Sequence, residues 1–221
     1  MQQRDHRSDA SGGRFMSGVA VRGDRLPVPT DAVVDPRIGA HGPALLALED
    51  GTVFRGISFG AAVSAGGDLV VNTSQTGYQE ICTDPSYAGQ VVVMTYPLIG
   101  NYGRIAGDDQ SARPWLSALV VAHATAAVLE PALQLVTLLR DTAVPAICGL
   151  DTRLLARTLR STGSQRAYIT APGMVDGAVA VDAARRLPRW EEQDFVRRVS
   201  AAEPYEIGPA DAPLVALVDY G

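Results

Sequence analysis

The chain has 221 residues, of which 47% are hydrophobic, and this is enough to bury the core of one sizeable domain. Its formal net charge of -5 makes nucleic acid or an anionic membrane surface a poor partner, so we expect small molecules or proteins instead. All 19 basic residues are arginines, and without lysine the chain can form neither a Schiff base nor a P-loop phosphate site.

The first 42 residues are rich in Arg, Asp, Ser, Gly and Pro and have little periodic apolar content. Such a segment cannot offset its ordering entropy by burial, so residues 1–42 are expected to form a disordered leader. No apolar run approaches the roughly 20 residues that span a bilayer, and the first 30 residues have no apolar centre typical of a signal peptide. The sequence therefore predicts a cytoplasmic protein without a membrane segment.

Ordered structure is expected to begin near Pro43 with a β-hairpin that turns at Asp50-Gly51. Residues 68–73 and 90–96 are predicted strands, and the β-branched run in the second indicates a buried central strand. The polar, turn-rich segment between them has room for at most a short helix before Asp84-Pro85. Polar segments between core strands are where functional sites usually lie.

Further strands are expected at residues 116–122, 145–149 and 165–170, after a solvated loop at 104–113. Helices are expected at 132–140, at 151–162, where Asp151 is placed to cap the first turn, and at 179–187. The predicted fold class is α/β, with packed helices against a mixed sheet built from strands near residues 45, 55, 70, 93, 118, 147 and 167.

The sequence after residue 187 indicates that one domain ends and another begins. Residues 188–213 combine clustered charges with several prolines, which is typical of an interdomain connector. Residues 214–221 then read as an apolar strand followed by Gly221, the usual start of a βα unit. We therefore interpret residues 43–187 as one domain and residues 214–221 as the first strand of a second domain that is missing.

No complete catalytic apparatus is evident. Cys82 and Cys148 lie far apart and lack the paired spacing of metal or redox motifs, so they are expected to be buried free thiols. The histidines are His6, His41 and His123, and no nucleophile elbow, dinucleotide fingerprint or zinc motif accompanies them. Gln79, Glu80 and Asp84 are expected either to form a polar network that faces the missing domain or to be solvated at the surface.

The run NTSQTGYQEICTDPSYAGQVVVMTYPLIGNYG, which begins at Asn72, resembles the signature of the small subunit of carbamoyl-phosphate synthase. Three further segments agree in order and spacing, namely ALLALEDGTVFRG, GLDTRLLARTLRSTG and the closing VALVDYG. The resemblance runs from about Ala44 to Gly221. It implies the amino-terminal domain of that subunit, a swivelling β/β/α domain, without the class I glutaminase half and its Cys, His and Glu.

In that family the serine of the D-P-S-Y step lines the glutamine pocket, and the matching residue is Ser86. The simpler alternative is that Ser86 only caps a turn. The resemblance further implies L-glutamine as ligand, a large subunit as partner, and a glutaminase domain encoded elsewhere. It implies no cofactor on this chain, because ATP and magnesium would be used by the large subunit, and no glutaminase activity of the isolated chain.

The sequence also departs from the family pattern, at the RIAGDDQS segment, Ala122, residues 128–131, Leu154 and Ala167. These departures affect docking of a large subunit more than the fold. Three hypotheses therefore remain: a ligase component serving arginine, pyrimidine or secondary metabolism, a degenerate non-catalytic paralogue that acts as a binding or scaffolding module, and an amino-acid-binding domain acting alone. The last is the weakest, since a pocket with one wall binds poorly.

Overall fold

A computed structural model of the chain describes residues 34–127, 134–209, 211 and 213–221. Residues 1–33 of the expected leader lie outside these residues, so their predicted disorder is untested. Residues 34–42 are ordered, contrary to the expectation, because they form a capped 3₁₀ turn at Pro36–Ile38 and Ile38 is buried in the core. Residues 128–131, where the sequence departs from the family pattern, also lie outside them, as does the expected start of a helix at Ala132.

In the part of the chain that the structure describes, seven strands occur at the positions that the sequence predicts, which confirms the α/β class with a mixed sheet. They are β1 (Gly42–Leu48), β2 (Val53–Gly60), β3 (Ala65–Asn72), β4 (Val91–Ile99), β5 (Ala118–Ala124), β6 (Pro145–Cys148) and β7 (Gln165–Ile169). The pairs β3–β4, β4–β5 and β5–β6 are parallel, and the pairs β1–β2, β1–β7, β2–β6 and β3–β7 are antiparallel.

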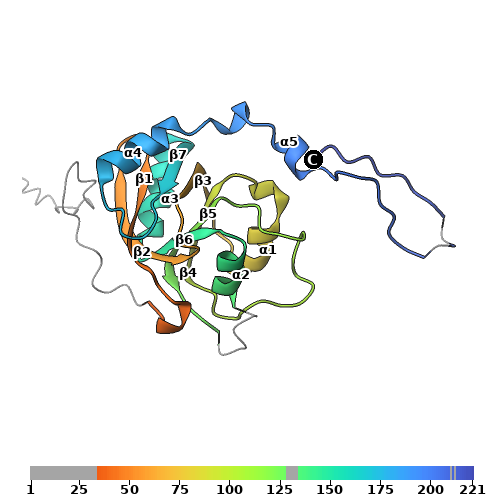
Figure 1. Cartoon of the computed structure of the whole chain (residues 1–221), viewed down its shortest axis with the longest axis horizontal. Helices are drawn as coiled ribbons and strands as arrows, with labels where there is room; N and C mark the ends of the chain where they lie inside the picture. Colours follow the sequence, from red (N-terminus) through yellow and green to blue (C-terminus); the bar gives the residue numbers. More distant parts are fainter. Residues whose placement is uncertain (1–33, 128–133, 210, 212) are drawn as a thin grey trace, which may run out of the picture.

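The sheet closes on itself as a barrel in the order β1-β2-β6-β5-β4-β3-β7 (Figure 1). Strand β7 makes the closure, because Ile169 pairs with Leu46 of β1 on one side and with Ala65 of β3 on the other. A closed sheet has no free edge to pair with other chains. The sequence predicts the strands but not this closure.

The helices are α1 (Tyr78–Thr83), α2 (Leu135–Asp141), α3 (Thr152–Thr162), α4 (Gly177–Arg186) and α5 (Phe195–Val199), with short 3₁₀ turns η1 (Pro36–Ile38), η2 (Pro85–Tyr87) and η4 (Trp190–Glu192). The predicted cap is confirmed, since Asp151 Oδ1 accepts a hydrogen bond from Leu154 N at 2.8 Å. Helix α5 and η4 fall in the segment that the sequence marked as a connector, where no helix was expected.

Strand β4 explains why its sequence is continuously apolar instead of alternating. Val91 and Val93 belong to a cluster with residues of β1, β3, β5, β6 and β7, which is the inside of the barrel. Val92 and Met94 point the other way, into a second cluster with α1 and α2. All four side chains are fully buried, as predicted, because both faces of the strand are covered.

Helix α3 covers the barrel interior at one end. Its Leu155 is fully buried in the same cluster as Val91 and Val93, and Leu159 packs against that cluster. Helix α4 covers the outer face of β1 through Ala180 and Val181. The barrel is therefore packed inside and has helices on separate outer faces.

Gly67 allows a close crossing inside the sheet. The sequence places Gly66 and Gly67 before a strand, whereas both lie within β3. A Cβ atom on Gly67 would fall 1.9 Å from the carbonyl oxygen of Gly89, so only glycine fits where β3 passes the segment that leads into β4.

Beyond α4 the chain stays on the surface before it leaves the barrel (Figure 1). Phe195 of α5 is buried and stacks on Trp190 with ring centroids 5.4 Å apart. Residues 213–221 are assigned no strand, and Leu214, Leu217 and Val218 are exposed. The expected strand at 214–220 is therefore not formed here, while its assignment to a second domain stays a prediction. No helix in the described residues is long and apolar enough to span a bilayer.

Candidate functional site

The site is built around α1 and η2, the polar segment between β3 and β4. Two tyrosines fix the start of α1. The rings of Tyr78 and Tyr102 stack with centroids 4.2 Å apart, and Tyr78 is fully buried. Tyr102 Oη accepts a hydrogen bond from Gly77 N at 2.6 Å, and Tyr78 Oη donates to the Gly103 carbonyl at 2.7 Å. Burial raises the pKa of Tyr78, so it remains a neutral donor.

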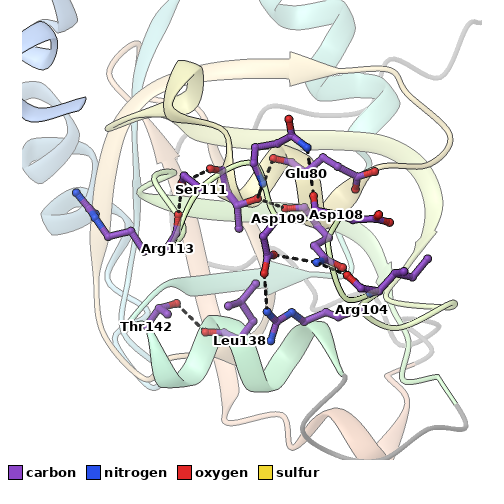
Figure 2. A network of polar contacts seen from close by, with 12 residues as sticks. Glu80, Arg104, Asp108, Asp109, Ser111, Arg113, Leu138 and Thr142 are labelled. Carbon is purple, nitrogen blue, oxygen red and sulfur yellow. Dashed lines mark hydrogen bonds and ion pairs between the residues drawn. The ribbon is translucent and has the colours of Figure 1, made fainter. Parts of the chain in front are cut away.

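Gln79 joins α1 to the loop that follows β4. Its Nε2 donates to the Ile105 carbonyl and to Asp109 Oδ1, both at 2.9 Å, while its Oε1 accepts from Ile105 N at 2.8 Å. Arg104 then pairs with Asp109 at 3.2 Å (Figure 2). Gln79 is 2% exposed, so it is not solvated. It does belong to a polar network, as one of the two expectations had it, and its described partners lie in this domain's own loop.

The end of α1 is tied to the same loop. Thr83 Oγ1 accepts a hydrogen bond from Gln110 N at 2.9 Å, and the Thr83 carbonyl accepts one from Ser111 Oγ at 2.6 Å. Figure 2 shows Ser111 inside this network, with the Arg113 side chain pointing away from it. The guanidinium of Arg113 lies 3.6 Å above the ring of Trp115. Helix α1 is thus held rigidly from both ends.

Ser86 lies on η2, directly after this rigid helix. Asp84 Oδ1 accepts a hydrogen bond from Ser86 N at 2.8 Å, which fixes the turn. The next residue, Tyr87, accepts at its hydroxyl from Asn72 Nδ2 at 2.9 Å, which ties η2 to the end of β3. Ser86 itself is exposed, and its hydroxyl makes no hydrogen bond to the described residues. It is therefore a polar group on a fixed backbone that is free to bind a ligand.

The cysteines offer no nucleophile in the described structure. Both are free and buried, as predicted. Burial raises the pKa of Cys82 to about 12 and that of Cys148 to about 11, so both are protonated at neutral pH. Among the described side chains, no group of three or more His, Cys, Asp and Glu residues is arranged to hold a metal ion.

Sequence reasoning placed Ser86 correctly on a turn after Asp84-Pro85 but missed the residues that support it. Asn72 and Tyr87 are 15 positions apart, and Gln79 and Ile105 are 26 apart. No local sequence pattern predicts hydrogen bonds between residues so far apart. The available signal was that the segment between β3 and β4 has many hydrogen-bonding side chains between two apolar strands. Such a segment predicts a polar network but not which residues bond to one another.

Comparison with known proteins places these elements in a family. Residues 46–169, from within β1 to the end of β7, match the family model described as carbamoyl-phosphate synthase small chain, CPSase domain. The carbamoyl phosphate synthase small chain of Chlorobaculum tepidum is 45% identical over 183 residues, which cover 81% of this chain and 50% of that protein. That of Symbiobacterium thermophilum is 44% identical over 182 residues, covering 79% and 49%.

The chain spans about half the length of these curated relatives. Among solved structures, an aminopeptidase from Aneurinibacillus sp. strain AM-1 aligns at 14% identity over 62% of this chain and 36% of that one, with a TM-score of 0.33, which is too low to indicate a shared fold. The family match covers the barrel from within β1 to the end of β7, together with the segment that carries Ser86. The chain belongs to the carbamoyl-phosphate synthase small chain family.

Proposed function

We propose that this chain is the glutamine-side component of a glutamine-dependent carbamoyl-phosphate synthase, a ligase that makes carbamoyl phosphate from glutamine, bicarbonate and ATP. In this proposal a class I glutaminase domain outside the chain releases ammonia from glutamine. A large subunit then uses ATP and magnesium to incorporate the ammonia, in the cytoplasm and for arginine or pyrimidine synthesis. Family membership and the match to about half of each relative support this division of labour.

The exposed hydroxyl of Ser86 is the observation that carries the proposal for this chain's own role. A hydroxyl donates one hydrogen bond and accepts others, so it can bind either the carboxylate or the ammonium group of an amino acid. The hydrogen bonds at Asp84 and Tyr87 hold its backbone on both sides. The Ser86 side chain therefore binds and orients glutamine, with little ordering entropy lost on binding.

Bond cleavage is assigned to the glutaminase domain. Cys82 is excluded as the nucleophile because it is fully buried and its pKa is raised to about 12 by burial. Ser86 moves no proton in this proposal. The isolated chain is accordingly expected to release no ammonia from glutamine.

The test is a chimera in which residues 44–213 of this chain replace the matching half of the Chlorobaculum tepidum small chain, assembled with that organism's large chain. Loss of one hydrogen bond to a charged group weakens binding by about 1.5 kcal/mol or more, or roughly tenfold. We expect Ser86→Ala to raise the KM for glutamine by about that factor and to leave synthesis from added ammonia unchanged. The control is Ser74→Ala, since Ser74 is an exposed serine on the preceding loop. Equal KM values for Ser86→Ala and Ser74→Ala would overturn the role of Ser86.

A second candidate is a non-catalytic paralogue that acts as a binding module. It is favoured by the departures from the family pattern, such as Ala122 and Leu154, which concern docking. The same chimera separates the two functions. Synthesis from glutamine supports the ligase component, whereas a stable, folded assembly that makes carbamoyl phosphate from ammonia only favours the binding module.

A further inference from the structure

Helix α3 carries three arginines on one exposed stripe. Arg153, Arg157 and Arg160 are spaced by four and three residues, so they fall on the same side of the helix over about 10 Å. All three are exposed. Leu155 lies in the barrel interior and fixes which side of the helix is buried. The three arginines therefore face solvent.

None of these arginines has an acidic partner within the described ranges. Among the described residues, the ion pairs of arginine are Arg37–Asp35, Arg104–Asp109, Arg166–Glu49 and Arg186–Asp182. No hydrogen bond joins the guanidinium group of Arg153, Arg157 or Arg160 to another described residue. The chain as a whole is acidic, with a net charge of -5, so these three arginines make the exposed surface of α3 locally positive.

An apolar groove lies beside the stripe. It has a volume of about 400 Å³ and runs between α3 and β3. Its walls include Leu69 and Val71 of β3 and Ala156 and Leu159 of α3, and Arg160 belongs to its lining. The last cation of the stripe is therefore also part of the groove.

We propose that α3 and this groove form a docking surface for an acidic protein segment that inserts one or two apolar side chains. The arginines attract the acidic side chains of the segment, and the groove binds its apolar side chains. A nucleic acid fits less well, because its backbone offers no aliphatic side chain to the groove and the rest of this protein is acidic. The proposal does not depend on the role of Ser86, which lies on η2 and not on α3.

The test uses the full chain and fluorescence anisotropy with labelled 16-residue amphipathic peptides. The first peptide carries three glutamates at helical spacing beside two leucines, the second has lysines in place of the glutamates, and the third has serines in place of the leucines. A DNA duplex of 20 base pairs is the fourth probe. The protein variants are Arg153→Gln/Arg157→Gln/Arg160→Gln and a control of equal charge, Arg140→Gln/Arg186→Gln/Arg197→Gln, in exposed positions of α2, α4 and α5.

We expect only the first peptide to bind well, more weakly at higher salt, and about tenfold more weakly to the α3 variant than to the control, which corresponds to about 1.4 kcal/mol. Thermal melting of both variants shows whether each is folded. Three results would overturn the proposal: equal affinity of the first peptide for the two variants, equal affinity of the third peptide, or tighter binding of the duplex through the same arginines. The last result would assign the stripe to nucleic acid.

Discussion

Removing a single oxygen from Tyr78 tests whether the buried tyrosine pair organises the candidate site. In Tyr78→Phe the ring stack on Tyr102 remains, but the Gly103 carbonyl loses its 2.7 Å donor and Tyr102 N loses its 3.2 Å acceptor. Gly103 is buried, so water cannot replace the hydroxyl easily. A buried unpaired polar group costs about 1–3 kcal/mol, and we expect a loss of about 2 kcal/mol in the free energy of unfolding.

For a domain of this size, such a loss lowers the melting temperature by roughly 4–8 °C. The measurement is urea and thermal unfolding of the full chain, and the matched control is Tyr96→Phe, since Tyr96 is half-buried and its hydroxyl bonds to no described residue. The control should stay within about 0.5 kcal/mol of the wild type. In addition, the amide hydrogen of Tyr102 should exchange faster in Tyr78→Phe. Equal stabilities of the two variants would refute the reasoning that the Tyr78 hydroxyl holds the loop.

Two further predictions concern the barrel and its response to acid. Gly67→Ala places a methyl group 1.9 Å from the Gly89 carbonyl oxygen, so we expect destabilisation by about 3 kcal/mol or more, whereas Gly177→Ala, whose nearest neighbour is 3.6 Å away, should change the free energy of unfolding by less than about 0.5 kcal/mol. A soluble, equally stable Gly67→Ala protein would contradict the close crossing of β3. Hydrogen bonds from Arg37 hold the pKa of Asp35 well below its usual range, although burial opposes them. The unfolded chain therefore takes up this proton first, and the contribution of Asp35 is present above about pH 4 and lost as the pH falls below it. Asp35→Asn should reduce the drop in stability between pH 7 and pH 3 in urea unfolding, and an unchanged drop would show that Asp35 contributes nothing to it.

The sequence alone determined where the strands lie, because the signals for a strand are local. Short runs with apolar residues, bounded by turn residues, marked all seven strands of the described structure, and the continuous β-branched run at Val91 to Met94 indicated a buried central strand. The cap at Asp151 and the turn before Ser86 were equally readable, since each depends on residues only two or three positions apart. The family signature lay in the same segment as Ser86.

Only the tertiary structure decided how these elements meet. Closure of the barrel depends on Ile169 pairing with both β1 and β3, and strand periodicity specifies which face is buried but not which strands are neighbours. Gln79 was expected to be solvated or to join a polar network, and the structure decides for the network: Gln79 is buried because the loop after β4 folds over it and supplies matching backbone groups. The sequence also leaves open whether the arginines of α3 are paired, and only the structure shows that no acidic side chain among the described residues pairs with them. Contacts between residues distant in sequence have no local pattern, and those contacts set the burial and charge pairing of the candidate site.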